Sequence, residues 1–108
     1  MKRGEVWWVD FGSARGSEIK KTRPAIILSN DASNASINRI QVVPVTSNTG
    51  RLYPSEAKII LNGNKSKAVA DQITTASKER FREILGKISK EELKEVERAV
   101  KIQLGIKI

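Results

Sequence analysis

The sequence predicts a mostly β domain with one helix at its C-terminal end, arranged as a small, strongly twisted antiparallel sheet or a partly open barrel. Short runs rich in β-branched and aromatic residues alternate with turn residues such as Gly, Pro and Asn. One amphipathic helical pattern closes the chain. The length of 108 residues suits a single domain, which we expect to span residues 1–108.

The β-prone runs are short and are separated by turn and loop residues. The elements expected in chain order are strands at 4–11, 24–29, 40–45, 57–61, 67–75 and 83–88, a turn at 62–64, and single helical turns over 31–38 and 77–81. Asn30 or Asp31 can cap the first helical turn. Pro44 lacks a backbone donor, which favours an edge position or a bulge for the strand at 40–45.

The C-terminal helix has the clearest signals. Ser89 followed by Glu92 fits a capping box at its start. Apolar residues then recur at helical spacing, and Gly105 is a typical stop. The predicted buried stripe consists of Leu93, Val96, Val100 and Leu104.

The composition excludes several kinds of chemistry. The sequence has no Cys and no His, which removes disulfides, thiol nucleophiles, histidine-ligated zinc and Ser-His-Asp catalysis. Its longest uncharged run, Ile40 to Gly50, is 11 residues, which is too short for a membrane span. No apolar stretch follows the basic start of the chain. We therefore expect a soluble, cytoplasmic protein with no membrane partner.

The net charge is +8, from 20 basic and 12 acidic residues. Between Ser13 and Arg23, four basic residues (Arg15, Lys20, Lys21 and Arg23) face one acid, Glu18. Such a basic loop favours contact with a nucleic-acid backbone, and the alternative is a solvated lysine-rich surface without a partner. Trp8 is a candidate for stacking on a base, whereas Trp7 is the candidate for the core with Val9 and Phe11.

Three positions combine polar chemistry with a defined backbone. Pro24 biases Arg23 toward an extended conformation, so its guanidinium leaves the sheet in a set direction, although a surface ion pair with Glu18 is the simpler interpretation. Thr46 and Ser47 place two hydroxyls where a strand becomes a loop. Asp71 and Gln72 interrupt an apolar run, so we expect Asp71 to be half-buried and paired with a group such as Arg23.

Taken together, these segments resemble the MazF/PemK (Kid) family of toxin endoribonucleases over residues 2–104. Five segments carry the resemblance in order along the chain: residues 2–7 (KRGEVW), 16–18 (GSE), 22–30 (TRPAIILSN), 43–47 (VPVTS) and 68–73 (AVADQI). The resemblance implies an SH3-like barrel with a terminal helix. It further implies a homodimer, sequence-selective cleavage of single-stranded RNA in a basic groove, and an antitoxin partner resembling MazE.

The resemblance also implies roles for individual residues. Arg23 matches the catalytic cation and Thr46 its partner near the scissile phosphate, while Glu18 and Ser47 match positions that line the site. Asp71 matches a proposed general base of the Kid-like branch, with Gln72 beside it, but the Arg and His of that branch appear here as Val69 and Ser17.

We expect transesterification by the 2′-hydroxyl of the RNA, without a metal ion or cofactor, and the general base stays open between Glu18 and Asp71. A binding protein on the same fold, like the gyrase poisons of the related CcdB branch, is the alternative function.

Overall fold

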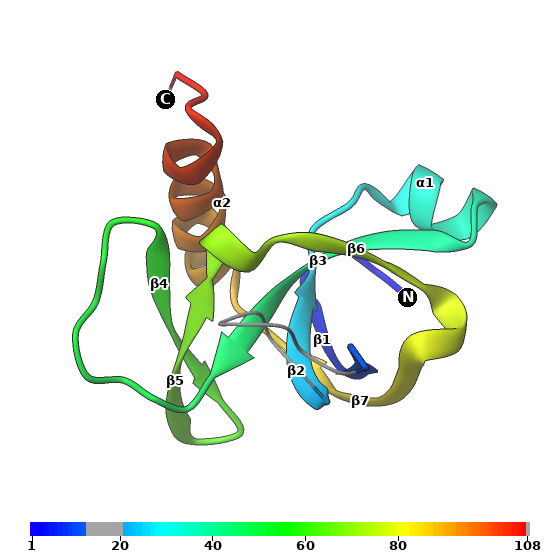
Figure 1. The fold of residues 1–108 in the computed structure, drawn as a ribbon, viewed down its shortest axis with the longest axis horizontal. Coiled ribbons are helices and arrows are strands. Elements are labelled where there is room, and N and C mark those ends of the chain that lie inside the picture. Colours follow the sequence, from blue (N-terminus) through cyan, green and yellow to red (C-terminus); the bar gives the residue numbers. More distant parts are fainter. Residues whose placement is uncertain (13–20, 108) are drawn as a thin grey trace.

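The computed structural model describes residues 1–12 and 21–107, which form a curled antiparallel sheet with a helix against it (Figure 1). Seven strands pair in the order β4-β5-β3-β2-β1-β7, and β6 pairs with β3 outside that order. The predicted mostly β fold with a C-terminal helix is confirmed as a half-barrel. The strands are β1 (Glu5–Asp10), β2 (Thr22–Ile27), β3 (Arg39–Thr46), β4 (Glu56–Leu61), β5 (Asn64–Val69), β6 (Thr74–Ser77) and β7 (Phe81–Lys87).

Helices and turns lie close to the predicted positions. The helices are α1 (Asp31–Ser36) and α2 (Lys90–Leu104), and short 3-10 turns form η1 (Ala70–Gln72) and η2 (Lys78–Arg80). Asn30 caps α1 by accepting the backbone N–H of Ser33. The turn between β4 and β5 is confirmed, with Asn62 at φ 51° and Gly63 at φ 81°. No helix among the described residues is long and apolar enough to cross a membrane.

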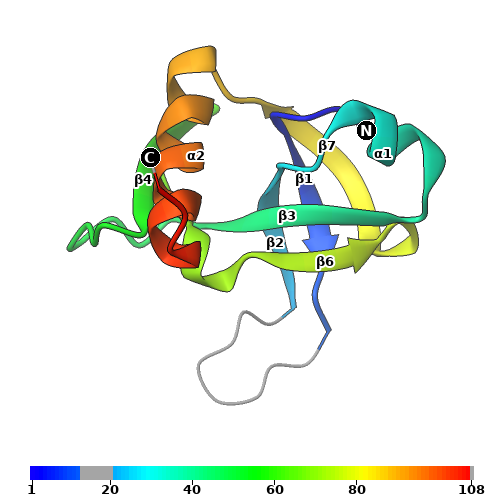
Figure 2. The ribbon, with the colours of Figure 1, turned by 90° about the horizontal axis from the view of Figure 1, so that it is seen from above.

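Strand β3 joins the two parts of the sheet. Its first half pairs with β6, side by side in Figure 2, and its last two residues, Val45 and Thr46, pair with β5. The opposite edge of β3 pairs with β2. Pro44 is buried in this interior strand, so the predicted edge position is wrong. It is tolerated because it lies between Val42 and Val45, where the partner on one edge changes from β6 to β5.

The two faces of the sheet bury two separate cores. One core contains Val6, Ile26, Val43 and Ile59 and packs against Val96 and Ala99 of α2. The other contains Val9, Ala25, Ile27, Val42 and Phe81. Trp7 lies partly buried against this second core, its ring edge-on to Phe81 with centroids 6.0 Å apart, as the sequence predicted.

Two details of the apolar pattern differ from the prediction. The strand expected at 67–75 is interrupted by η1, because the backbone N–H of Ile73 bonds to the carbonyl of Ala70 instead of to a neighbouring strand. Leu104 is exposed, and Ala99 instead is fully buried with Val96. The end of α2 thus extends past the sheet, and its last apolar residues have no core to enter.

The capping box at the start of α2 is present and also ties the helix to β4. Ser89 accepts the backbone N–H of Glu92, and the Glu92 carboxylate accepts the backbone N–H of Ser89 at 2.8 Å and that of Ile60 at 2.7 Å. Partial burial raises the pKa of Glu92, but these hydrogen bonds outweigh that effect and hold the pKa below its ordinary value of 4.5. The ionised carboxylate is therefore the stabilising form.

Replacing this carboxylate should lower stability in a pH-dependent way. Because the pKa of Glu92 is lower in the folded state, its contribution is complete above the ordinary pKa and is lost as the pH falls through the folded pKa. We expect Glu92→Gln to lower the free energy of unfolding by about 1 kcal/mol at pH 7 and by much less at pH 3. Urea unfolding at both pH values measures this. Glu91→Gln, an exposed carboxylate in the same helical turn, is the control, and an equal loss in both variants would contradict the assignment.

Candidate functional site

The ends of β2 and β3 bring Arg23 and Thr46 to the same level of the sheet. The last paired residues of these two strands are Ala25 and Pro44. Continuing that antiparallel alignment by two residues sets Arg23 opposite Thr46, and cross-strand neighbours project to the same face. Thr46 in turn pairs with Lys67 of β5. One row of polar residues therefore crosses this end of the sheet.

Arg23 lines a depression of about 210 Å³ at this end. Trp8, Pro24 and Ser47 line it too, and the register places Trp8 opposite Pro24. Trp8 is 36% exposed, so the tryptophan predicted as a stacking surface does reach solvent here. Arg23 is half-buried and forms no ion pair with any acidic side chain among the described residues. A guanidinium in this state is suited to an anion such as phosphate.

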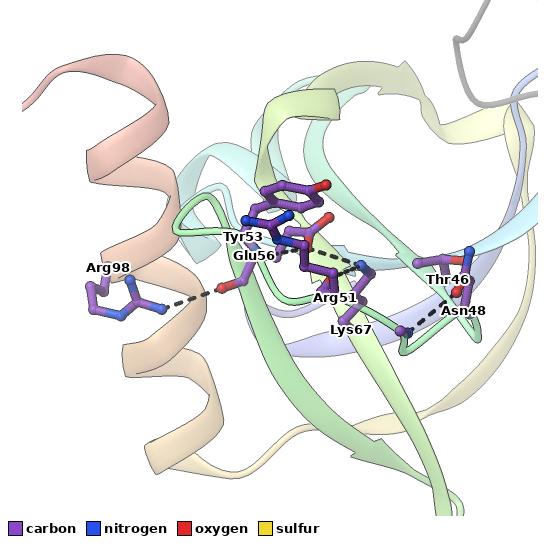
Figure 3. Close-up of polar contacts among 8 residues, drawn as sticks. Thr46, Asn48, Arg51, Tyr53, Glu56, Lys67 and Arg98 are labelled. Carbon is purple, nitrogen blue, oxygen red and sulfur yellow. Dashed lines mark hydrogen bonds and ion pairs between the residues drawn. The ribbon is translucent and has the colours of Figure 1, made fainter.

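The hydroxyl of Thr46 has one defined partner. Its oxygen accepts the backbone N–H of Asn48 at 3.1 Å (Figure 3). A threonine hydroxyl donates one hydrogen bond and accepts others, so this contact uses an acceptor site and leaves the proton for another group. Thr46 can thus donate to an oxygen of a bound anion.

Part of the predicted basic loop lies outside the described residues. Arg15, Glu18 and Lys20 belong to that part, as does Ser17. The loop closes where the N–H of Phe11 bonds to the carbonyl of Lys21 at 2.9 Å and the N–H of Lys21 bonds to that of Gly12 at 2.6 Å. Lys21 has φ 59° and is exposed, so its ammonium extends from the base of this loop.

Asp71 and Gln72 lie apart from Arg23. Both belong to η1 and line a second depression of about 530 Å³ with Tyr53 and Ile102. The expected half-burial of Asp71 is wrong, because η1 carries it out of the sheet to an exposed position. Asp71 and Arg23 form no ion pair. No three acidic side chains within residues 1–12 and 21–107 gather into a group that could hold a metal ion.

Further charged groups surround the end of β1 beside the loop. The pKa of Asp10 lies below its ordinary value because the N–H of Gly12 and the guanidinium of Arg82 both bond to its carboxylate. Arg82 is 3.0 Å from that carboxylate, and Arg80 donates to the Asp10 carbonyl. Asp10 therefore remains ionised and holds two arginines against β1.

The buried ion pair near Thr46 was not predicted from the sequence. Lys67 and Glu56 are both 8% exposed, and their charged atoms are 2.9 Å apart. Nothing in the local sequence distinguishes Lys67 from the exposed Lys65. The difference in their burial results from the pairing of β5 with β3 and β4.

Comparison with known proteins supports a specific family. Residues 2–104 match the family model described as PemK-like, MazF-like toxin of type II toxin–antitoxin system. The chain is 39% identical, over an alignment 117 positions long, to endoribonuclease MazF9 of Mycobacterium tuberculosis, with 98% of each chain covered. The crystal structure of MazF from Deinococcus radiodurans (form I) is similar at TM-score 0.84 and 28% identity, covering 98% of this chain and 97% of that one. A MazE–MazF structure (form II) from the same organism has TM-score 0.78 and 27% identity, with coverage of 99% and 97%.

The position of Trp8 beside Arg23 gives a direct binding assay. In Trp7→Phe, Trp8 is the remaining tryptophan, so its emission reports on the depression. We expect a single-stranded 2′-deoxy oligonucleotide to change this emission saturably. Adding Arg23→Met should weaken binding by about tenfold, since a charge-assisted contact is lost. Arg39→Met, an exposed arginine at the far end of β3, is the control. Binding seen by anisotropy without any change in Trp8 emission would contradict this site.

Proposed function

Because this chain belongs to the PemK-like, MazF-like family of toxins of type II toxin–antitoxin systems, we propose that it is an endoribonuclease that cuts single-stranded RNA at selected sequences. The observation that carries the proposal is the pairing of Ala25 with Pro44, because its continuation sets Arg23 near the start of β2 opposite Thr46 at the end of β3. This alignment supplies a cation and a hydroxyl at one end of the sheet, and Arg23 also lines the depression that contains the exposed Trp8. We also propose that the protein is cytoplasmic and encounters its RNA substrate there.

The reaction we propose is transesterification within the RNA. The 2′-oxygen attacks the neighbouring phosphorus, a 2′-O–P bond forms, and the bond to the 5′-oxygen breaks. Negative charge builds on the phosphorane, where the planar guanidinium of Arg23 can donate two hydrogen bonds. The Thr46 proton can bond to a non-bridging oxygen or to the leaving oxygen. Since Arg23 itself supplies the positive charge, the step needs no metal ion.

The 2′-hydroxyl must also lose a proton to a carboxylate, and the leaving 5′-oxygen gains a proton from water. Glu18 and Asp71 are the two candidate proton acceptors. The location of Asp71 in a different depression from Arg23 supports Glu18. Ser47 is then a site-lining residue beside Arg23, whereas Gln72 lies with Asp71 in the other depression. Arg15, Lys20 and Lys21 contact the backbone of the RNA through their charge.

We also propose two protein partners. The MazE–MazF structures among the relatives support an antitoxin, and a basic surface that accepts RNA suits an acidic antitoxin segment that competes for the same cations. The second partner is another copy of this chain. Exposed apolar side chains at the end of α2, Ile102, Leu104 and Ile106, support a homodimer.

Removal of Arg23 or Thr46 should abolish most activity without unfolding the protein. Loss of one charged donor to a developing oxyanion costs on the order of 10²–10³ in rate. We expect Arg23→Ala to lose at least that in kcat and Thr46→Ala nearly as much, with unchanged thermal unfolding. Single-turnover cleavage of a defined transcript measures both, with Arg39→Ala as the matched control.

The products identify the chemistry in the same assay. A 2′,3′-cyclic phosphate and a 5′-hydroxyl are expected, and a 2′-deoxy nucleotide at the cut site should block cleavage. Activity that EDTA removes and magnesium restores would contradict the mechanism. RNA left intact by the wild-type protein would instead favour a toxin that acts by binding.

The homodimer has its own test. Sedimentation equilibrium at micromolar concentration should give twice the mass of the chain, because association of two copies would remove the exposed apolar side chains at the end of α2 from water. A species of single-chain mass alone at that concentration would overturn the dimer.

A further inference from the structure

The buried pair Lys67–Glu56 joins the sheet to the loop of residues 47–55, which follows Thr46. The Lys67 ammonium contacts the Glu56 carboxylate at 2.9 Å and donates to the carbonyl of Arg51 at 2.7 Å (Figure 3). The same carboxylate oxygen of Glu56 accepts the N–H of Tyr53 at 2.9 Å. Two charges taken out of water are thus satisfied largely by loop backbone, and the middle of the loop has a defined position.

The far end of this loop is held separately. Arg98 of α2 donates to the carbonyls of Pro54 at 3.2 Å and Glu56 at 3.3 Å. The N–H of Ala70 bonds to the carbonyl of Ser55. Loss of the Lys67–Glu56 contact would therefore free the segment between Ser47 and Tyr53 while its attachment to β4 remains.

The residues that directly follow Thr46 determine which hydrogen bond its hydroxyl oxygen accepts. Lys67 is the cross-strand partner of Thr46, and both project to the same face. The N–H that occupies the Thr46 oxygen comes from Asn48, and the Asn48 side chain in turn accepts the N–H of Gly50 at 3.3 Å. Arg51 follows Gly50, and its carbonyl accepts a hydrogen bond from the Lys67 ammonium. A short chain of contacts thus leads from the ion pair to the Thr46 hydroxyl.

We propose that Lys67 and Glu56 are positioning residues, whose buried ion pair holds the 47–55 loop so that Asn48 occupies the Thr46 oxygen and the Thr46 proton faces the reacting phosphate. This inference rests on the proposed endoribonuclease function. Lys67 and Glu56 themselves do not touch the RNA in this arrangement. Their effect passes through the loop backbone to Thr46.

The decisive variant removes both charges together. A single substitution would leave one buried charge unpaired and endanger folding, whereas Lys67→Met with Glu56→Gln keeps the net charge and leaves an amide oxygen to accept the Tyr53 N–H. We expect near wild-type thermal unfolding, an unchanged KM, and a kcat lowered on the order of 10-fold, since small misplacements of a reacting group are costly. A folded double variant with wild-type kcat would overturn the proposal.

Lys58→Met is the matched control. Lys58 is exposed and is the cross-strand partner of Lys67 on β4, and its side chain forms no hydrogen bond or ion pair with the described residues, so this variant removes a charge from the same face without removing a bond to the loop. It should retain wild-type kcat. If Lys58→Met lowers kcat as much as the double variant does, the loss is caused by the change of charge on this face and not by a change in the position of the loop.

Combining the double variant with Thr46→Ala tests whether the ion pair acts on kcat through Thr46 or by disturbing the structure in general. In a Thr46→Ala background, the double variant should lower kcat no further, because the hydroxyl that the loop positions is already absent. Independent, multiplying losses would overturn the proposal.

Amide hydrogen exchange measures how well the loop of residues 47–55 is ordered, and it does not depend on RNA cleavage. The amides of Asn48 and Gly50 should lose protection on the order of 10-fold in the double variant, while those of Ala70 and of Tyr53, whose acceptor oxygen is retained, keep their protection. If the wild-type protein leaves RNA intact, the proposed function fails, and this exchange result alone still decides whether the ion pair holds the loop. If RNA is cut and exchange is unchanged, the positioning inference fails and the function stands.

Discussion

Strand β3 is the element on which the rest of the structure depends, because its side chains are buried on both faces of the sheet. Val43 and Val45 enter the core that α2 covers, whereas Ile40 and Val42 enter the opposite core. A strand that is buried on both faces cannot shift by one residue without exchanging the two sets. The position of Thr46, at the end of β3, is therefore determined by the packing of both cores.

The same strand determines where a site can form. β2 and β3 are paired as far as Ala25 and Pro44, and two residues beyond this pair lie Arg23, which precedes Ala25, and Thr46, which follows Pro44. Arg23 and Thr46 are thus held by strands whose register is specified by apolar packing, while the loop before Arg23 and the loop after Thr46 carry charge and hydroxyl groups. Rigid strands supply the geometry, and the loops supply contact with a partner, which is a common division of roles in binding and catalytic sites.

Local patterns in the sequence predicted much of this arrangement. The capping box at Ser89, the turn at Asn62 and the strand ends at Arg23 and Thr46 all depend on neighbouring residues, so the sequence reveals them directly. Pairing between distant strands is different. The burial of Lys67 follows from its register with Thr46, and the exposure of Asp71 follows from the departure of η1 from the sheet. Neither can be deduced from composition or periodicity.

Rescue of Arg23→Ala by added guanidinium ions tests most directly whether the guanidinium at this position is the catalytic cation. The cavity left by the truncated side chain lies at the depression beside Trp8 and Ser47, where a small planar cation can enter. If Arg23 is the catalytic cation, millimolar guanidinium should restore RNA cleavage partially and saturably, whereas sodium or urea at the same concentration should restore none. If guanidinium restores no cleavage although the variant is folded and binds RNA, that result would contradict a catalytic role for the Arg23 guanidinium.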